Sequence, residues 1–474
     1  MMDTIVRLEN ITIENFKNIE RGQLSFANNR KAFRTSILGL YGQNGSGKTA
    51  LIDAIELLQH ALRGQPVPSK FADYINVEAN AATLHYEFSV TGRTGKYQAY
   101  YDFKLKAEKI EASQNLGDQP CEETQHKAVI SEEVLGYSYE DGSTKIRKGA
   151  LIDTTSSKVF TPASKYACLL GKDKDLAMNL MVDKKVTTGA SKSFVFSREL
   201  LTAIRNNEQG KADPEYQRHM FLIESLVQYG NYELFVINTA NTGIISMNAL
   251  PLAFKYESGA RAAVGNILIP LENEVPIPEN AVEMVQTVIS NMNVVLSQIV
   301  PGLTITVKIL GDIVFSNGEK GFKIQLMSLK NKKEIPLKYE SEGIKKIISI
   351  LQLLIVVYNR SSITVAIDEL DSGVFEYLLG ELLRIISEKG KGQLIFTSHN
   401  LRPLETLDRG FIAFTTTNPS NRYIRMTNLK DNNNLRDFYF RDIILGEQNE
   451  EVYEPTNNAE IALAFREAGE FSGS

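Results

Sequence analysis

The feature that most constrains this chain is a glycine-rich run between an apolar segment and an amphipathic one. Residues 42–49 read Gly-Gln-Asn-Gly-Ser-Gly-Lys-Thr, which satisfies the phosphate-loop pattern. The segment before it, Ser36 to Tyr41, is apolar, and apolar residues recur at helical spacing from Thr49 to Leu62. A strand, this loop and a helix form the context that the pattern requires. We therefore expect an α/β fold built around a phosphate-binding loop.

The residue types in the loop point to nucleotide chemistry. Glycines let the backbone fold tightly, so that successive N–H groups and the helix N-terminus face phosphate oxygens. Lys48 would reach the β and γ phosphates, and the Thr49 hydroxyl would ligate Mg²⁺. The expected cofactors are ATP and Mg²⁺. The expected nucleotide-binding residues in the loop are Gly42, Asn44, Gly45, Ser46, Gly47, Lys48 and Thr49.

A second motif, later in the chain, contains two acidic residues at the end of an apolar run. The apolar run Ile363 to Ile367 ends in Asp368 and Glu369, the pattern of a Walker B strand. Asp368 would hold the Mg²⁺ shell, and Glu369 would orient or deprotonate the attacking water. Taken alone, two acids after a strand reflect equally well the preference of helix N-termini for negative charge. The phosphate loop in the same chain favours the catalytic interpretation.

Five segments occur in an order that is similar to a known group. They are residues 14–18 (Glu-Asn-Phe-Lys-Asn), the phosphate loop, 339–346 (Tyr-Glu-Ser-Glu-Gly-Ile-Lys-Lys), 368–373 (Asp-Glu-Leu-Asp-Ser-Gly) and 396–400 (Phe-Thr-Ser-His-Asn). The chain thereby resembles the ABC-type ATPases of the SMC and RecF kind. Within that group it resembles the bacterial AAA-family ATPases related to the overcoming-lysogenisation-defect proteins of anti-phage defence. The resemblance implies an α/β fold: an ABC-type P-loop ATPase head, with a mixed sheet, flanking helices and an inserted, mainly helical lobe.

The resemblance also implies roles for residues outside the two Walker motifs. Ser341 and Gly343 look like the signature motif, although Glu342 and Ile344 depart from the standard glycine pair. In the family this motif closes over a γ phosphate held by the opposite subunit, so ATP joins two heads. His399 resembles the switch histidine that senses that phosphate, and would be catalytic together with Glu369 and Lys48. The plainer interpretations are a helix N-cap for Ser341 and a structural histidine for His399.

Some positions have weaker signals. Gln98 is a weak candidate for the Q-loop glutamine, and Phe375 departs from the usual residues of the D-loop. Lys17 could approach phosphate, although a solvated strand residue is the simpler interpretation.

The motif map divides the 474 residues as a split head with an insertion. We expect residues 1–105 to form the first half of the head and 106–302 an insertion of β-hairpins followed by a helical lobe. Residues 303–446 would form the second half, and 447–474 a tail. Prolines interrupt the stretch from Thr161 to Pro301, which favours a compact lobe over a coiled-coil arm.

Charge and cysteine content limit the partners and the compartment. Lys plus Arg number 52 against 57 Asp plus Glu, a net charge of −5, which argues against coating nucleic acid by bulk charge. Cys121 and Cys168 form no CxxC and no disulfide framework, as in a reducing compartment. The first residues carry charges where a secretory signal needs an apolar run, and no apolar stretch reaches the length of a membrane span. We expect a cytoplasmic protein with no membrane partner.

Two functions from different classes fit these features. In the first, which the family resemblance implies, the chain forms a head-to-head dimer or higher oligomer that regulates a separately encoded effector, such as a nuclease, in anti-phage defence. The second is a RecF-like, ATP-dependent DNA clamp in repair. Its DNA contacts would come from Lys184 and Lys185 or from Lys330, Lys332 and Lys333. A transporter motor is disfavoured by the absence of a spanning segment and by the large insert.

Overall fold

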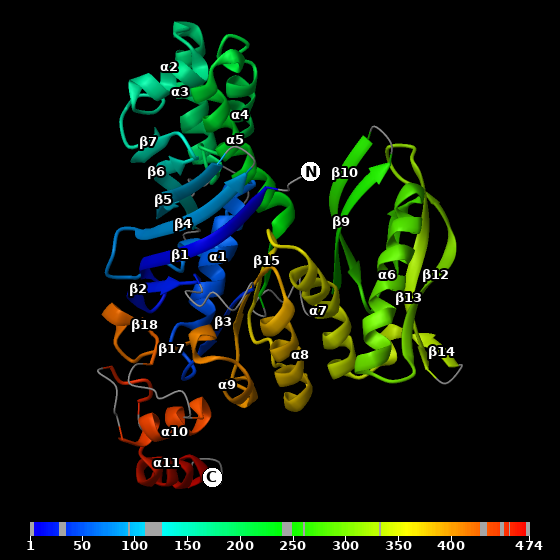
Figure 1. Cartoon of the computed structure of the whole chain (residues 1–474). Helices are drawn as coiled ribbons and strands as arrows, with labels where there is room; N and C mark the ends of the chain where they lie inside the picture. The colour runs from blue at the N-terminus through cyan, green and yellow to red at the C-terminus, as the bar shows by residue number, and fades with distance from the viewer. Residues whose placement is uncertain are drawn as a thin grey trace, which may run out of the picture.

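Two six-stranded sheets on either side of one helix form the centre of the molecule (Figure 1). The computed structural model describes residues 4–27, 35–92, 95–109, 126–238, 249–258, 261–330, 333–426, 434–445, 450–454 and 456–470. Two further lobes extend from this centre, one helical and one mixed (Figure 1). Among the described residues, no helix has the length and hydrophobicity that a membrane span needs.

The first sheet is mainly parallel and positions the candidate site. Its strand order is β18-β17-β3-β16-β15-β8, and only the pairing of β17 with β18 is antiparallel. Every residue of β3, β15 and β16 is buried, which explains their uninterrupted apolar runs. The carboxyl ends of these strands meet at one edge, where ligands bind in open α/β sheets. The strand bounds are β3 Ser36–Tyr41, β8 Leu234–Ile237, β15 Thr364–Ile367, β16 Gln393–Thr397, β17 Ile412–Thr415 and β18 Tyr423–Ile424.

The second sheet is antiparallel and follows the order β2-β1-β4-β5-β6-β7. Burial alternates along β4, where every second residue faces the core and the others face outward. The bounds are β1 Ile5–Phe16, β2 Ile19–Ser25, β4 Ala82–Gly92, β5 Gly95–Lys109, β6 His126–Glu140 and β7 Lys145–Asp153.

Helix α1 (Lys48–Leu62) fills the space between the two sheets. Its buried side chains join residues of the antiparallel sheet in one core cluster, together with Leu38, Ala366 and Ile395 of the parallel sheet. The hydroxyl of Tyr86, on β4, donates to the carbonyl of Ala54 on the helix at 2.7 Å. The helix predicted from Thr49 to Leu62 is therefore the central element of the head.

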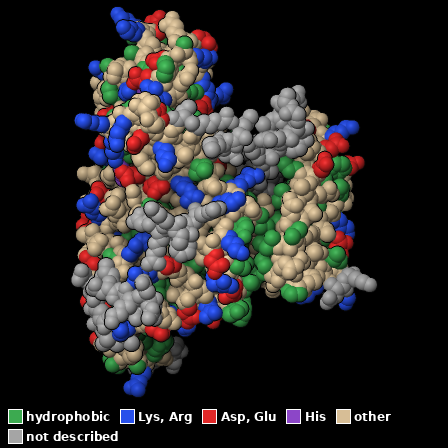
Figure 2. All heavy atoms as spheres, viewed as in Figure 1, with side chains coloured by type: hydrophobic (Ala, Val, Ile, Leu, Met, Phe, Trp, Pro, Cys, Tyr) green, Lys and Arg blue, Asp and Glu red, His purple; other side chains and the backbone are tan. Residues whose placement is uncertain are grey.

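The helical lobe packs on the antiparallel sheet and contains α2 (Ala163–Leu170), α3 (Lys174–Gly189), α4 (Arg198–Arg205) and α5 (Pro214–Gln228) (Figure 1). Glu133 on β6 is fully buried beneath it and accepts hydrogen bonds from Tyr101, Ser193 and the Phe194 amide. Burial raises the pKa of this carboxyl group. Acidic and basic side chains are interspersed over the visible face of this lobe (Figure 2). That mixture agrees with the mild net charge of the chain.

The second lobe combines short sheets with α6 (Glu279–Ile299). Strands β9 (Ala249–Ser258) and β10 (Arg261–Pro270) form a hairpin, and β13 (Lys320–Lys330) pairs with β11 (Val275–Pro278), β12 (Leu303–Val314) and β14 (Lys333–Pro336). Helix α6 packs on β12 and β13. The remaining helices are α7 (Glu342–Asn359), α8 (Glu376–Lys389), α9 (Arg402–Thr406), α10 (Leu435–Leu445) and α11 (Asn458–Glu470).

The structure divides the chain differently from the expected domain boundaries. The boundary after residue 105 falls inside β5, and the antiparallel sheet continues through β7, because β5 and β6 pair along their lengths. Residues 303–330, expected in the head, form β12 and β13 of the second lobe. Conversely β8, inside the expected insertion, is an edge strand of the parallel sheet, since it pairs with β15.

Candidate functional site

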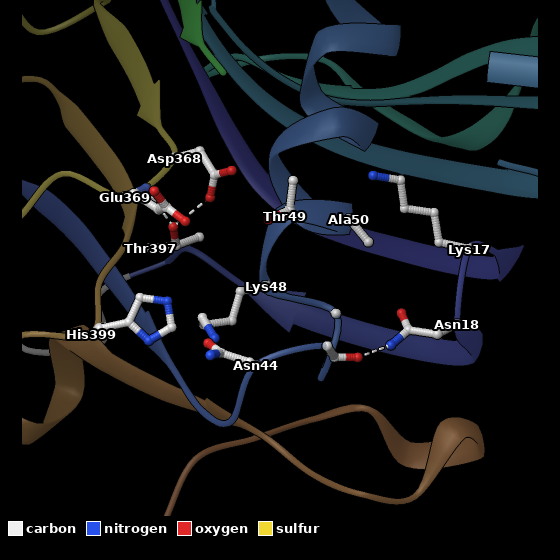
Figure 3. A pocket seen from close by; sticks show the side chains of 12 residues that line it. Lys17, Asn18, Asn44, Lys48, Thr49, Ala50, Asp368, Glu369, Thr397 and His399 are labelled. Carbon is white, nitrogen blue, oxygen red and sulfur yellow. Dashed lines mark hydrogen bonds between the residues drawn. The ribbon is translucent and has the colours of Figure 1, made fainter. Parts of the chain in front are cut away.

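A pocket of about 330 Å³ opens at the carboxyl edge of the parallel sheet (Figure 3). One wall carries Lys48 and Thr49 with Asn44, Gly45 and Gly47, and another carries Asp368, Glu369, Thr397 and His399. These residues follow β3, β15 and β16, whose ends converge as the fold class requires. Lys17, Asn18 and Ala50 complete the lining. The pocket thus joins most of the predicted site residues.

The phosphate loop has the backbone conformation that its glycines permit. Gly47 has a φ of 95°, in the left-handed region, and is the N-cap of α1. Lys48 is buried, and its Nζ donates to the carbonyls of Gly42 and Gln43 at 2.8 and 2.9 Å. Burial lowers the pKa of Lys48, while the charges of Asp368, Glu369 and Asp371 act to raise it. The lysine is therefore held by carbonyls of its own loop, in the same pocket as the acids.

The two predicted loop residues that do not line the pocket are Gly42 and Ser46. The hydroxyl of Ser46 is turned toward Thr415, at 2.5 Å from its Oγ1, and donates to the Gln43 carbonyl at 2.6 Å. Gly42 contributes to a neighbouring pocket that also contains Tyr439 and Tyr453. The Ser46 side chain therefore makes hydrogen bonds to the loop and to Thr415 and does not line the pocket.

A threonine that the sequence motifs did not single out organises the acids. The Thr397 hydroxyl donates to the Asp368 carboxylate at 2.5 Å and accepts from the Glu369 amide at 2.8 Å (Figure 3). Asp368 is 1% exposed, so its position is set by these neighbours. Glu369 has a φ of 48°, a strained conformation for a residue other than glycine and one that clusters at functional sites. The left-handed backbone conformation of Glu369 changes the direction of the chain directly after Asp368.

Asp371 fixes the loop that carries His399. Its carboxylate accepts hydrogen bonds from the backbone amides of His399 and Asn400, at 3.1 and 2.9 Å. The imidazole of His399 is exposed and lies at the rim of the pocket (Figure 3). A residue of segment 368–373 is thereby tied directly to the predicted switch histidine.

The predicted signature residues lie outside this pocket. Ser341 and Gly343 do not line it. Ser341 is exposed and is the N-cap of α7, where its hydroxyl accepts a bond from the Ile344 amide at 3.4 Å. Gly343 approaches the D-loop so closely that an added Cβ would lie 2.6 Å from the Gly373 carbonyl oxygen. The structure therefore joins the signature segment to the D-loop of its own chain, and not to its own phosphate loop.

The turn between β1 and β2 forms the opposite end of the pocket. Lys17 makes an ion pair with the buried Asp53 of α1, and its Nζ lies 3.9 Å from the centroid of the Tyr74 ring. Asn18 donates to the Gly45 carbonyl of the phosphate loop (Figure 3). The interpretation of Lys17 as a solvated strand residue is wrong, because Lys17 lies in the turn after β1 and its ammonium group is paired with a buried carboxylate. Gln98 is exposed on β5 and does not line the pocket.

The family comparison agrees with the phosphate-loop geometry. Residues 10–215 match the family model described as the AAA domain. This segment begins within β1, includes the phosphate loop, α1, β4 to β7 and part of the helical lobe, and is shorter than half of the chain. The search of curated proteins found no significant match.

Among solved structures the chain is similar to Smc heads. The Smc head bound to the C-winged helix domain of ScpA is 11% identical, with 88% of this chain and 97% of that chain covered and a TM-score of 0.35. The Pyrococcus furiosus Smc head, with an extended coiled coil and bound to the C-terminal domain of ScpA, is 10% identical, with 89% and 96% covered and a TM-score of 0.37. The SMC head domain of Thermotoga maritima is 13% identical, with 89% and 99% covered and a TM-score of 0.34.

The chain's own topology defines its fold class. A mainly parallel sheet that leads into a phosphate loop and a central helix, with an antiparallel sheet on the other side of that helix, has the fold of an ABC-type P-loop head, as the motifs predict.

Proposed function

We propose that this protein binds ATP with Mg²⁺ in the pocket at the carboxyl edge of the parallel sheet and hydrolyses it. The observation that carries the proposal is the convergence of Lys48, Asp368 and Glu369 on one cavity from distant parts of the sequence. A cation, a buried acid and a half-buried acid in that arrangement suit phosphoryl transfer to water. A Gly-rich turn with an ordinary surface lysine would not need the acids.

Each residue has a distinct role in this reaction. Lys48 and the loop amides would hold the β and γ phosphates, and Glu369 would orient the attacking water and accept its proton. The Thr49 hydroxyl and the Asp368 carboxylate line the same cavity, so the residues fit a magnesium ion. When bound, that ion would neutralise developing charge on the phosphate oxygens. His399 would contact the γ phosphate from the rim.

The substitution Glu369→Gln tests the hydrolytic step. The amide keeps the size of the side chain but cannot accept the proton of the water, so we expect turnover to fall by about 10²-fold or more while ATP still binds. Steady-state phosphate release together with an ATP-binding titration measures both effects. Turnover at the wild-type rate in this variant would remove Glu369 from the catalytic role.

The signature segment supports a composite site in a two-fold dimer. Ser341 and Gly343 are separated from their own pocket, and an exposed helix N-terminus is suited to bind a phosphate held by another head. In a symmetric pair each head would complete the other's site. ATP would then hold the two heads together, and its hydrolysis would release them.

Complementation between two inactive variants tests the composite site. Lys48→Ala removes the phosphate contact and Ser341→Arg blocks the signature side. In a mixed dimer one site has both defects and the other has none. Mixing the variants should therefore restore about one quarter of the wild-type ATPase rate, because half of the dimers are mixed and each has one intact site. If the mixture stays as inactive as its components, the sites are not shared.

The finer proposal is that this ATPase regulates a separately encoded effector, such as a nuclease, in anti-phage defence. It rests on the order of the sequence motifs. One of the lysines expected to contact DNA in the clamp alternative is engaged within the helical lobe. Lys184 Nζ donates to the carbonyls of Thr154, Ser156 and Lys158 at 2.7–3.0 Å. Lys332 lies outside the described residues.

A phage challenge tests the defence role. Cells that carry this gene with its natural neighbours should resist phage, and Lys48→Ala should abolish the resistance. The second part of the experiment measures DNA binding by the purified protein over a range of salt concentrations, with and without ATP. Unchanged plaque numbers combined with tight, ATP-dependent DNA binding would overturn the defence proposal in favour of a clamp.

A further inference from the structure

A second cavity, of about 880 Å³, lies where the helical lobe packs on the antiparallel sheet (Figure 1). It is larger than the nucleotide pocket of about 330 Å³ and shares none of the residues that line that pocket. Its walls come from β5, from β6 and the turn after it, and from α4, α5 and the segment between these helices. The volume falls within the range of about 300–1,000 Å³ that is typical of sites for small molecules.

Aromatic side chains form a wall of this cavity. Tyr97 on β5 and Tyr139 on β6 are opposite each other in the sheet, and their ring centroids lie 4.7 Å apart. The ring of Phe221, on α5, stacks on the Tyr97 ring, with the centroids 5.5 Å apart and an angle of 29° between the planes. All three residues line the cavity. Such a wall favours a flat aromatic group over a strongly hydrated one.

Four of the five charged side chains that line the cavity have partners within the protein. Arg205 donates two hydrogen bonds to Glu224, at 2.7 and 3.0 Å. Lys211 makes an ion pair with Glu208 at 2.5 Å. Asp141 accepts hydrogen bonds from two backbone amides of its own turn, at 2.7 and 2.8 Å. The two acids of the lining are therefore already bound to donors other than the fifth charged group.

That fifth group is Arg218, a half-buried residue of α5. Within the described part of the chain, it makes no ion pair, and its buried Nε has no hydrogen-bond partner. Its guanidinium carbon lies 5.9 Å from the centroid of the Tyr139 ring. A guanidinium group stays charged and has five N–H donors, so its partial burial without an acceptor is costly. Carboxylate and phosphate oxygens are the acceptors that arginine binds best, because two parallel hydrogen bonds can form.

We propose that the second cavity binds a small organic anion in which a planar aromatic ring carries a carboxylate or phosphate group. The ring would lie against Tyr97 and Phe221, and the anionic group would pair with Arg218. Because the sheet and α5 both line the cavity, a bound ligand would join the helical lobe to the head. The proposal does not depend on ATP binding, since the two cavities have no lining residue in common.

Fluorescence titration of the full chain with 1-anilinonaphthalene-8-sulfonate tests the site. This probe has aromatic rings and one anionic group, and the chain has no tryptophan whose fluorescence would overlap with it. The Lys48→Ala background removes the phosphate-loop lysine, so that nucleotides do not compete there. We expect one equivalent of probe to bind with saturation.

Two competitors then distinguish the sources of such a ligand. Displacement of the probe by AMP supports a site for mononucleotides, and displacement by 2-naphthoate supports a site for aromatic carboxylates. A probe that does not saturate, or that neither compound displaces, would overturn the proposal.

Arg218→Met, in the same background, tests the residue that carries the argument. Methionine keeps an apolar stem of similar length but has no charge, so the Kd of the probe should rise by about 10-fold or more. Arg198→Met is the matched control, because Arg198 is an exposed residue of α4 that does not line the cavity. Its Kd should stay at the background value. Equal Kd values in the two variants would show that the anion does not bind to Arg218.

Glu224→Gln changes the charge of the cavity in the opposite direction, which a misfolded variant would not imitate. The substitution removes the charge that neutralises Arg205, so a second guanidinium becomes available to the anion. The Kd of the probe should fall by about 2- to 5-fold. An unchanged or increased Kd in Glu224→Gln would contradict binding of an anion in this cavity.

Discussion

The pocket at the carboxyl edge of the parallel sheet and the contact between Cys168 and Asp213 in the helical lobe are assembled in different ways. In the pocket, parallel strands deliver Lys48, Asp368 and His399 to one edge, because the carboxyl ends of neighbouring parallel strands meet there. In the lobe, the ends of two helices bring Cys168 beside Asp213, and no general rule of topology requires that contact. The difference explains why sequence motifs predicted the pocket and not the contact. The order of the strands determines which side chains meet at a sheet edge, whereas helix packing depends on many individual side chains.

The largest effect on turnover is expected for Thr397, which lines the pocket. The substitution Thr397→Val removes the hydroxyl that bonds to Asp368 and to the Glu369 amide. Loss of a buried partner costs about 1–3 kcal/mol, which corresponds to a rate decrease of about 5- to 160-fold if the cost falls on the transition state. Phosphate release at saturating ATP measures this decrease.

Thr364 provides the matched control for that prediction. It lies on β15, and its buried hydroxyl donates to Gln393 at 2.9 Å, away from the pocket lining. Thr364→Val should lower the free energy of unfolding by about 1–3 kcal/mol and leave the turnover number unchanged. Equal losses of turnover in the two variants would contradict a positioning role for Thr397.

A smaller effect is expected in the helical lobe. Lys184 Nζ donates to three backbone carbonyls, so Lys184→Met should lower the free energy of unfolding by about 1–3 kcal/mol without changing the Kd for ATP. Lys185, its exposed neighbour, is the control, and Lys185→Met should change stability by no more than about 0.5 kcal/mol. Denaturant unfolding measures both. A loss of ATP binding in Lys184→Met would indicate that the lobe and the pocket are coupled.

The sequence predicted most elements of the head and several of their boundaries. The apolar run predicted at Ser36–Tyr41 coincides with β3. The helix expected from Thr49 to Leu62 is α1, which begins one residue earlier. Buried parallel strands and amphipathic helices have strong periodic signals, because each must bury a continuous face. The residues of the Walker motifs were found for the same reason, since each follows a recognisable strand.

The elements that were missed depend on contacts between distant segments. The strand β8 has four residues, and a short apolar run does not distinguish a strand from part of a helix until β15 pairs with it. Lys17 contacts Asp53 and Tyr74, and no local sequence pattern predicts those partners. The contact between Cys168 and Asp213 joins two helices, and no sequence spacing indicates it. Such contacts become visible only when the packing is known.

The most direct test of the central claim is ATP binding by Lys48→Ala. The claim is that residues 42–49, together with Asp368 and Glu369, form an ATP site. Isothermal titration of the wild type with ATP and Mg²⁺ should give a saturable Kd, and the variant should give no measurable binding at the same concentrations. Unfolding curves that coincide for the two proteins would exclude misfolding as the cause. An unchanged Kd in Lys48→Ala would contradict the assignment of this pocket as the nucleotide site.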